Sequence, residues 1–149
     1  MSYSNQAAQS YLRNAVLTAT QEQLHLMLID GAIRFTTQGR DALQRDALEP
    51  AFNALERAQK IMIELINGLK RDTNPELVDR MAGLYGFIYR RIVEANSSRQ
   101  LKPLDEALHF LREQRSTWQL LMERISKEVP ESARNAANKP TEEALSLQG

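Results

Sequence analysis

The sequence predicts an all-α protein: an antiparallel up-down four-helix bundle with a short extra N-terminal helix and a flexible C-terminal tail. Apolar residues recur at helical spacing along most of the chain. Only six Gly and five Pro occur in 149 residues, and they fall mainly where helices are expected to begin or end. This length is sufficient for one domain with a sizeable core.

The first two long helices have recognisable starts. Thr20 is expected to cap the first helix, because Thr20 and Gln23 have the spacing of a capping box. The helical pattern then continues to about Arg45. Pro50 suits the first turn of the second helix, which we expect to end near Leu69.

The third and fourth helices are delimited in the same way. Asn74 is a favourable cap and is followed by Pro75, so the third helix begins there and ends near Asn96, a residue that tolerates the left-handed conformation. Pro103 starts the fourth helix, and Pro130 is expected to stop it. Short connections between four long helices favour antiparallel neighbours.

The two ends of the chain are expected to lie outside this bundle. We assign residues 1–19 to an N-terminal lid with a short helix over 6–17, residues 20–129 to the bundle, and residues 130–149 to a largely disordered tail. The N-terminal helix is too short to be stable alone. The tail has little apolar content.

Composition narrows the class of partner. Lys and Arg together number 19, as do Asp and Glu, and the two signs are interspersed, which argues against nucleic acid as a partner. No apolar run approaches the roughly 20 residues of a membrane span, and no signal peptide is visible at Met1. Cysteine is absent, so disulfides are excluded. We therefore expect a cytoplasmic protein that does not insert into membranes.

Two of the helices are apolar over too much of their circumference for a simple bundle. Leu24, Leu28 and Phe35 form one stripe of the first long helix, while Ile29 and Ile33 lie on roughly the opposite side. The third helix likewise carries two apolar rows. Either the N-terminal segment, the tail or a homodimer covers the surplus surface, or it forms a groove for another protein's helices.

One catalytic pattern was considered as an alternative. Glu22 and His25 form a Glu-x-x-His pair, as do Glu106 and His109, and carboxylate-bridged di-iron bundles use two such pairs. Glu22 and Glu106 both lie in the first turn of their helices, and these helices are expected to be antiparallel. The pairs would then be separated by roughly 30 Å. We therefore expect no enzyme activity, no metal and no cofactor.

Several segments resemble the flagellin-specific export chaperones of the FliS family. The segments that carry the resemblance are Tyr11-x-x-x-x-Val16-x-Thr18-Ala19-Thr20 with Asp30-Gly31, then Ala58-Gln59-Lys60-Ile61-Met62, then Leu84-Tyr85-Gly86-Phe87 with Arg90-Arg91-Ile92-Val93-Glu94-Ala95-Asn96, and Trp118. Three positions depart from the family's usual pattern: Gln21 stands where Pro is common, Ile29 where an aromatic is common, and Phe87 where a second Tyr is common. These changes preserve apolar character or capping and bear on the identity of the client rather than on the fold.

The resemblance implies a cytoplasmic chaperone that binds the disordered C-terminal segment of flagellin in apolar grooves. It would prevent premature polymerisation and deliver flagellin to the type III export apparatus. The runner-up is a helical homo-oligomeric adaptor or structural protein with a different client. On the chaperone hypothesis, Tyr11 and Val16 anchor the N-terminal lid. The predicted groove residues are Leu24, Leu28, Ile29, Ile33, Tyr85, Ile88, Tyr89 and Ile92, for each of which core packing is the alternative role.

Overall fold

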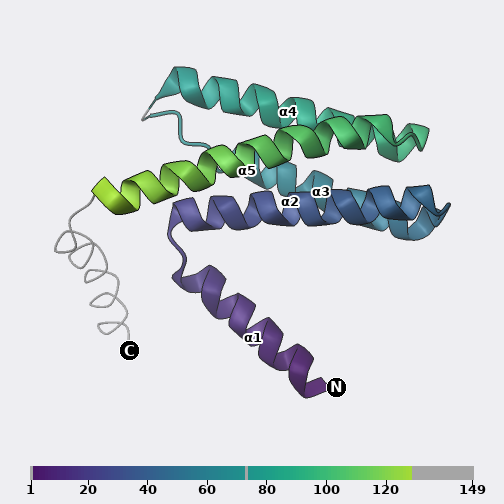
Figure 1. Cartoon of the computed structure of the whole chain (residues 1–149), viewed down its shortest axis with the longest axis horizontal. Coiled ribbons are helices and arrows are strands. Elements are labelled where there is room, and N and C mark those ends of the chain that lie inside the picture. Colours follow the sequence, from purple (N-terminus) through teal and green to yellow (C-terminus); the bar gives the residue numbers. More distant parts are fainter. Residues whose placement is uncertain (1, 73, 129–149) are drawn as a thin grey trace. The chain divides into compact units, whose positions relative to one another are not determined.

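A computed structural model describes residues 2–72 and 74–128, and every regular element in this range is helical (Figure 1). The helices are α1 (Ser2–Thr18), α2 (Gln21–Gln44), α3 (Leu48–Asn67), α4 (Pro75–Ser98) and α5 (Lys102–Glu128). The predicted all-α fold is confirmed. The chain divides into two compact units, 1–116 and 117–149, so the second unit begins within α5. The predicted tail, 130–149, lies outside the described residues.

The caps predicted for α2 and α4 are present. The Thr20 hydroxyl accepts a hydrogen bond from the Gln23 N–H at 3.1 Å, and the Gln23 side chain accepts one from the Thr20 N–H at 2.9 Å. The Asn74 side chain accepts from the Leu77 N–H at 3.3 Å. These bonds satisfy backbone donors that a helix start leaves free, and therefore they fix where α2 and α4 begin.

Helix α3 begins at Leu48, so Pro50 lies within its first turn, as predicted. The end of α4 differs from the prediction by two residues. Helix α4 continues past Asn96 to Ser98, and Arg99 has the left-handed conformation, with φ of 60°. The helix therefore ends two residues beyond Asn96, and the left-handed position expected at Asn96 falls at Arg99, whose N–H donates to the Ala95 carbonyl at 2.8 Å.

Helix α3 packs on both α2 and α4, and the first part of α5 is joined to α2 and α4 by ion pairs. Three ion pairs join α5 to its neighbours: Arg40–Asp105 at 2.5 Å, Arg115–Asp30 at 2.5 Å and Arg91–Glu106 at 2.8 Å. The end of α2 thus meets the start of α5, and the two helices are antiparallel, as the sequence predicted.

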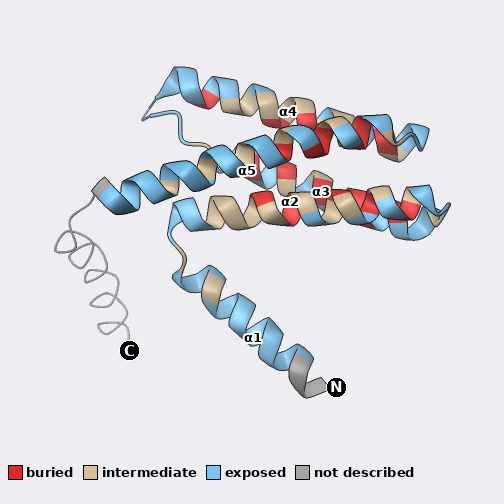
Figure 2. Ribbon diagram, in the orientation of Figure 1, coloured by how far each residue is buried: buried red, intermediate tan, exposed pale blue. Residues whose placement is uncertain are grey.

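The core lies between α2, α3, α4 and the first part of α5 (Figure 2). The largest fully buried apolar side chains are Ile29, Leu55, Met62, Leu65, Tyr85, Ile88, Ile92, Leu104 and Leu111. Each such side chain contributes about 1.5–3 kcal/mol when it leaves water. Among the described residues, no helix combines the length and apolar character needed to cross a membrane.

A glycine on α2 allows close packing against α3. A Cβ at Gly39 would lie 2.4 Å from Cδ2 of Leu55, which is fully buried. Gly39 therefore sets how near the two helices come.

Thr36 presents a buried hydroxyl that has no hydrogen-bond partner in the described part of the chain. Thr36→Val keeps the shape of the side chain and removes the unpaired group, so we expect the free energy of unfolding to rise by about 1 kcal/mol in urea titrations. Thr37→Val is the matched control, because the Thr37 hydroxyl donates to the Ile33 carbonyl at 2.7 Å. A loss of stability in Thr36→Val would show that this hydroxyl has a partner, such as a buried water.

Candidate functional site

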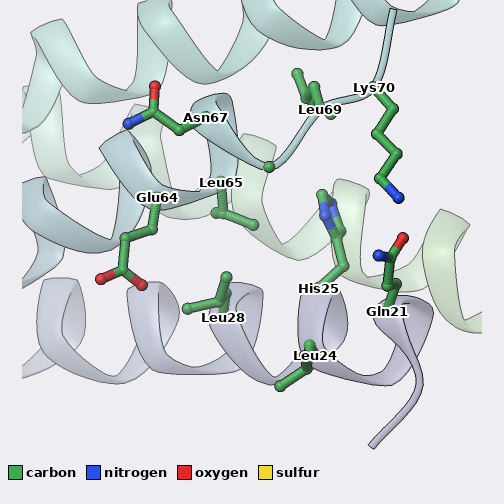
Figure 3. A pocket seen from close by; sticks show the side chains of 10 residues that line it. Gln21, Leu24, His25, Leu28, Glu64, Leu65, Asn67, Leu69 and Lys70 are labelled. Atoms are coloured by element: carbon green, nitrogen blue, oxygen red, sulfur yellow. The ribbon is translucent and has the colours of Figure 1, made fainter. Parts of the chain in front are cut away.

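A pocket of about 360 Å³ lies between the first turns of α2 and the end of α3 (Figure 3). Its apolar side chains come from both helices and from the connector that follows α3, and Leu28 and Leu65 point toward one another across it. Charged and polar groups complete its walls. The lining residues are Gln21, Leu24, His25, Leu28, Glu64, Leu65, Asn67, Gly68, Leu69 and Lys70.

A hydrogen-bonded group connects this pocket to the core. The Tyr85 hydroxyl lies 2.7 Å from Nε2 of His25, and it accepts a hydrogen bond from the Gln114 side chain at 3.2 Å. With the Gln114 amide donating to it, the hydroxyl is free to donate to a neutral His25. Tyr85 is fully buried, and burial raises its pKa to about 12. The pocket wall at His25 is therefore held in place by α4 and α5.

His25 should make stability depend on pH. Burial lowers the pKa of His25 below its ordinary value of 6.5. The unfolded chain then binds a proton more readily than the folded chain, so the contribution of neutral His25 is complete above pH 6.5 and is lost as the pH falls through the lowered pKa. Melting temperatures between about pH 7.5 and pH 5 should fall more in the wild type than in His25→Gln. His109→Gln replaces an exposed histidine, so its melting temperature should fall with pH as much as that of the wild type. If the melting temperature of His25→Gln falls by the same amount, His25 does not contribute to the pH dependence.

The structure separates the predicted groove residues into three groups. Leu24 and Leu28 line the pocket. Ile33 and Tyr89 are half-buried. Four others are fully buried in the core: Ile29, Tyr85, Ile88 and Ile92. For these four residues the structure shows core packing, the alternative role. Contact of the predicted groove residues with a client remains a prediction.

The two predicted lid anchors lie on α1. The side chains of Tyr11 and Val16 are 75% and 45% exposed, and Leu12 and Leu17 are exposed beside them. An apolar helix face exposed to this extent is unusual for a surface with no partner. A covering role for α1 remains a prediction.

The contribution of α3 to the pocket was missed at the level of sequence. Leu65 lies in the last turn of α3 and Leu69 in the connector that follows, and the two are four residues apart in the sequence. Glu64 and Lys70 add opposite charges to the walls. The spacing alone could have indicated an apolar cluster there, but not that it faces the start of α2.

A second, shallower depression of about 550 Å³ lies over α4 and α5. Phe87 and Phe110 meet edge to face in it, with ring centroids 5.6 Å apart. Phe87, one of the departures from the family's usual pattern, thus lies at a surface. The change from tyrosine there alters a surface rather than the core.

The residues of the di-iron alternative are engaged elsewhere. His25 bonds Tyr85, Glu106 pairs with Arg91, and His109 lies 3.2 Å from Glu113 on the surface of α5. The described residues contain no group of three or more His, Asp or Glu side chains that could hold a metal ion. The antiparallel arrangement of α2 and α5 places Glu22 and Glu106 at opposite ends of the pair.

An apolar pocket between two helices, with charges in its walls, suits uptake of apolar side chains from another helix. The fold and the site thus define a helical binding protein. Comparison with known proteins is more specific: residues 3–125 match the family described as Flagellar protein FliS, and the chain belongs to this family. It is a flagellar secretion chaperone and not an enzyme.

Individual relatives agree with this assignment. The chain is 35% identical over 109 residues to the flagellar secretion chaperone FliS of Bacillus subtilis, covering 73% of this chain and 80% of that protein. It is 28% identical to the FliS of Vibrio cholerae, covering 67% and 74% respectively. A crystal structure of a bacterial flagellar chaperone superposes with a TM-score of 0.67 over 81% of this chain and 98% of that chain. At 23% identity, that likeness supports the fold.

Proposed function

We propose that this chaperone binds the disordered C-terminal segment of flagellin in the cytoplasm and holds it as helix on its apolar surface. Bound in this way, the segment cannot polymerise before the chaperone delivers it to the type III export apparatus. The observation that carries the proposal is the pocket between α2 and α3, whose volume of about 360 Å³ lies within the range of ligand sites. Membership of the FliS family supports the same client.

Binding would couple to folding of the client. A disordered segment loses conformational entropy when it becomes helical, so it needs a large apolar contact to offset that cost. Exposed apolar residues of α3 and α4 extend the available surface beyond the pocket; these include Leu48, Phe52, Ile63 and Val93. We further propose that α1 acts as a movable lid anchored by Tyr11 and Val16, which occupies apolar surface when the client is absent.

Calorimetry with the C-terminal segment of flagellin from the same organism tests the proposal. We expect saturable binding to the wild-type chain and at least about tenfold weaker binding to Leu24→Glu, because the variant places a charge in the pocket. Leu77→Glu is the matched control, since Leu77 is 51% exposed and lies outside the pocket. Undetectable binding of the wild type at micromolar concentration would refute the client, and equal weakening by both variants would refute the pocket as its site.

A further inference from the structure

Two arginines from different helices approach the same aromatic ring on the surface formed by α2 and α3. The guanidinium carbon of Arg34 lies 5.0 Å from the centroid of the Phe35 ring, and that of Arg57 lies 5.4 Å from it. The two charges are therefore no more than about 10 Å apart. Cation–π attraction holds each guanidinium near the half-buried ring and limits its rotation.

No acidic side chain in the described residues pairs with either arginine. The nearby acids in sequence are engaged: Asp30 pairs with Arg115 at 2.5 Å, and Glu56 pairs with Lys60 at 3.5 Å. Two exposed guanidiniums within about 10 Å of one another and without a counter-charge repel one another. A carboxylate received between them would remove this repulsion and could accept several N–H bonds.

This pair lies on the same seam between helices as the pocket. One side of α2 carries, in order along the helix, Leu24, Leu28, Gly31 and Phe35. The two helices touch between these points, since a Cβ at Gly31 would lie 3.2 Å from Cδ1 of Ile61. Helix α3 runs in the opposite direction, so the order along it is Leu65 in the pocket, then Ile61, then Arg57.

The separation along α2 sets the spacing that a bound helix would need. Phe35 lies seven residues beyond Leu28 and eleven beyond Leu24, which corresponds to roughly 10–16 Å of helix. A helix bound along the seam that places an apolar side chain in the pocket would bring a residue two to three turns away next to the arginines. An acidic residue at that point matches their charge.

We propose that Arg34 and Arg57 form a carboxylate-binding site that receives an acidic side chain of the bound client helix, about seven to eleven residues from its apolar anchor. This inference rests on the proposed function, because it concerns the same bound segment. The apolar pocket alone would accept a helix shifted by one turn. The paired arginines would fix the register and the direction of the helix, which is the usual contribution of charged groups to an interface.

The test compares two double variants that lose the same charge. Arg34→Gln with Arg57→Gln should bind the C-terminal segment of flagellin about fivefold more weakly than the wild type at low ionic strength, with the difference shrinking at higher salt. Arg80→Gln with Arg90→Gln removes two exposed arginines of α4 and should change the affinity less than about twofold. Melting temperatures of both variants establish that they are folded.

A scan of the client identifies the acidic partner. Each Asp or Glu of the flagellin segment is replaced singly by Asn or Gln. One of these replacements should weaken binding to the wild-type chaperone. The same replacement should not weaken binding to the double variant Arg34→Gln with Arg57→Gln, which already lacks the site. Equal losses in the two double variants, or additive losses for every client position, would overturn the inference and leave the proposed function standing. Absence of binding by the wild type would instead remove the proposed function and the inference together.

Discussion

Replacement of Ile29 by aspartate is expected to unfold the bundle. Ile29 is fully buried in α2, and a carboxylate at this position would have no water and no cationic partner among the buried apolar side chains. Burial of an unpaired charge costs several kcal/mol, which is comparable with the whole stability of a domain of this size. Loss of the helical circular dichroism signal, or of a cooperative thermal transition, would show this.

Ile33→Asp provides the matched control one turn further along α2. Ile33 is half-buried, so its aspartate can reach solvent and the variant should keep its helical signal and a cooperative transition. If Ile33 also belongs to the client groove, this variant should bind the flagellin segment more weakly than the wild type. Unfolding of Ile33→Asp would remove Ile33 from the groove, and a folded Ile29→Asp would contradict the burial of Ile29.

Substitutions at two glycines should change stability in opposite directions. A Cβ at Gly39 would lie 2.4 Å from Cδ2 and 2.6 Å from Cγ of Leu55, so the side chain of the fully buried Leu55 would have to shift within the core. We expect Gly39→Ala to lower the free energy of unfolding by about 1–2 kcal/mol, because the strain of overpacking exceeds the gain in helix propensity. Urea titration measures the difference.

Gly83→Ala tests the gain in helix propensity at a position where the added Cβ meets no neighbouring atom. Gly83 is exposed in α4, and a Cβ there would meet nothing within 4 Å. Alanine should therefore raise the free energy of unfolding by up to about 1 kcal/mol. If both variants changed stability in the same direction, the close approach of α2 and α3 at Gly39 would not be the controlling factor.

Local signals in the sequence predicted the helices well. The capping box at Thr20 and the Asn74 cap each depend on residues three positions apart, so the information needed to place them lies within one turn. The residue at which α4 ends was harder to predict from the sequence. Asn96 tolerates the left-handed conformation, but this local preference does not by itself stop a helix, and α4 continues to Ser98.

The candidate site was predicted only in part, because periodicity places residues around one helix but does not identify its neighbours. The predicted groove includes Leu24 and Leu28, but their neighbours in the pocket are Leu65 of α3 and Leu69 of the connector that follows, and the sequence pattern predicts no groove residue in either segment. The same limitation applies to Ile29, which is a predicted groove residue and is fully buried in the core. Only the arrangement of α2 between α3 and α5 shows that this side is covered.

The order of charge along α2 and α5 has a consequence for the topology of the chain. Asp30 and Arg40 are ten residues apart on α2, and Asp105 and Arg115 are ten residues apart on α5. Opposite charges meet at both places only when the two helices run in opposite directions. With α5 reversed in the same register, acid would face acid and base would face base. This arrangement of four side chains electrostatically disfavours a bundle in which α5 runs parallel to α2.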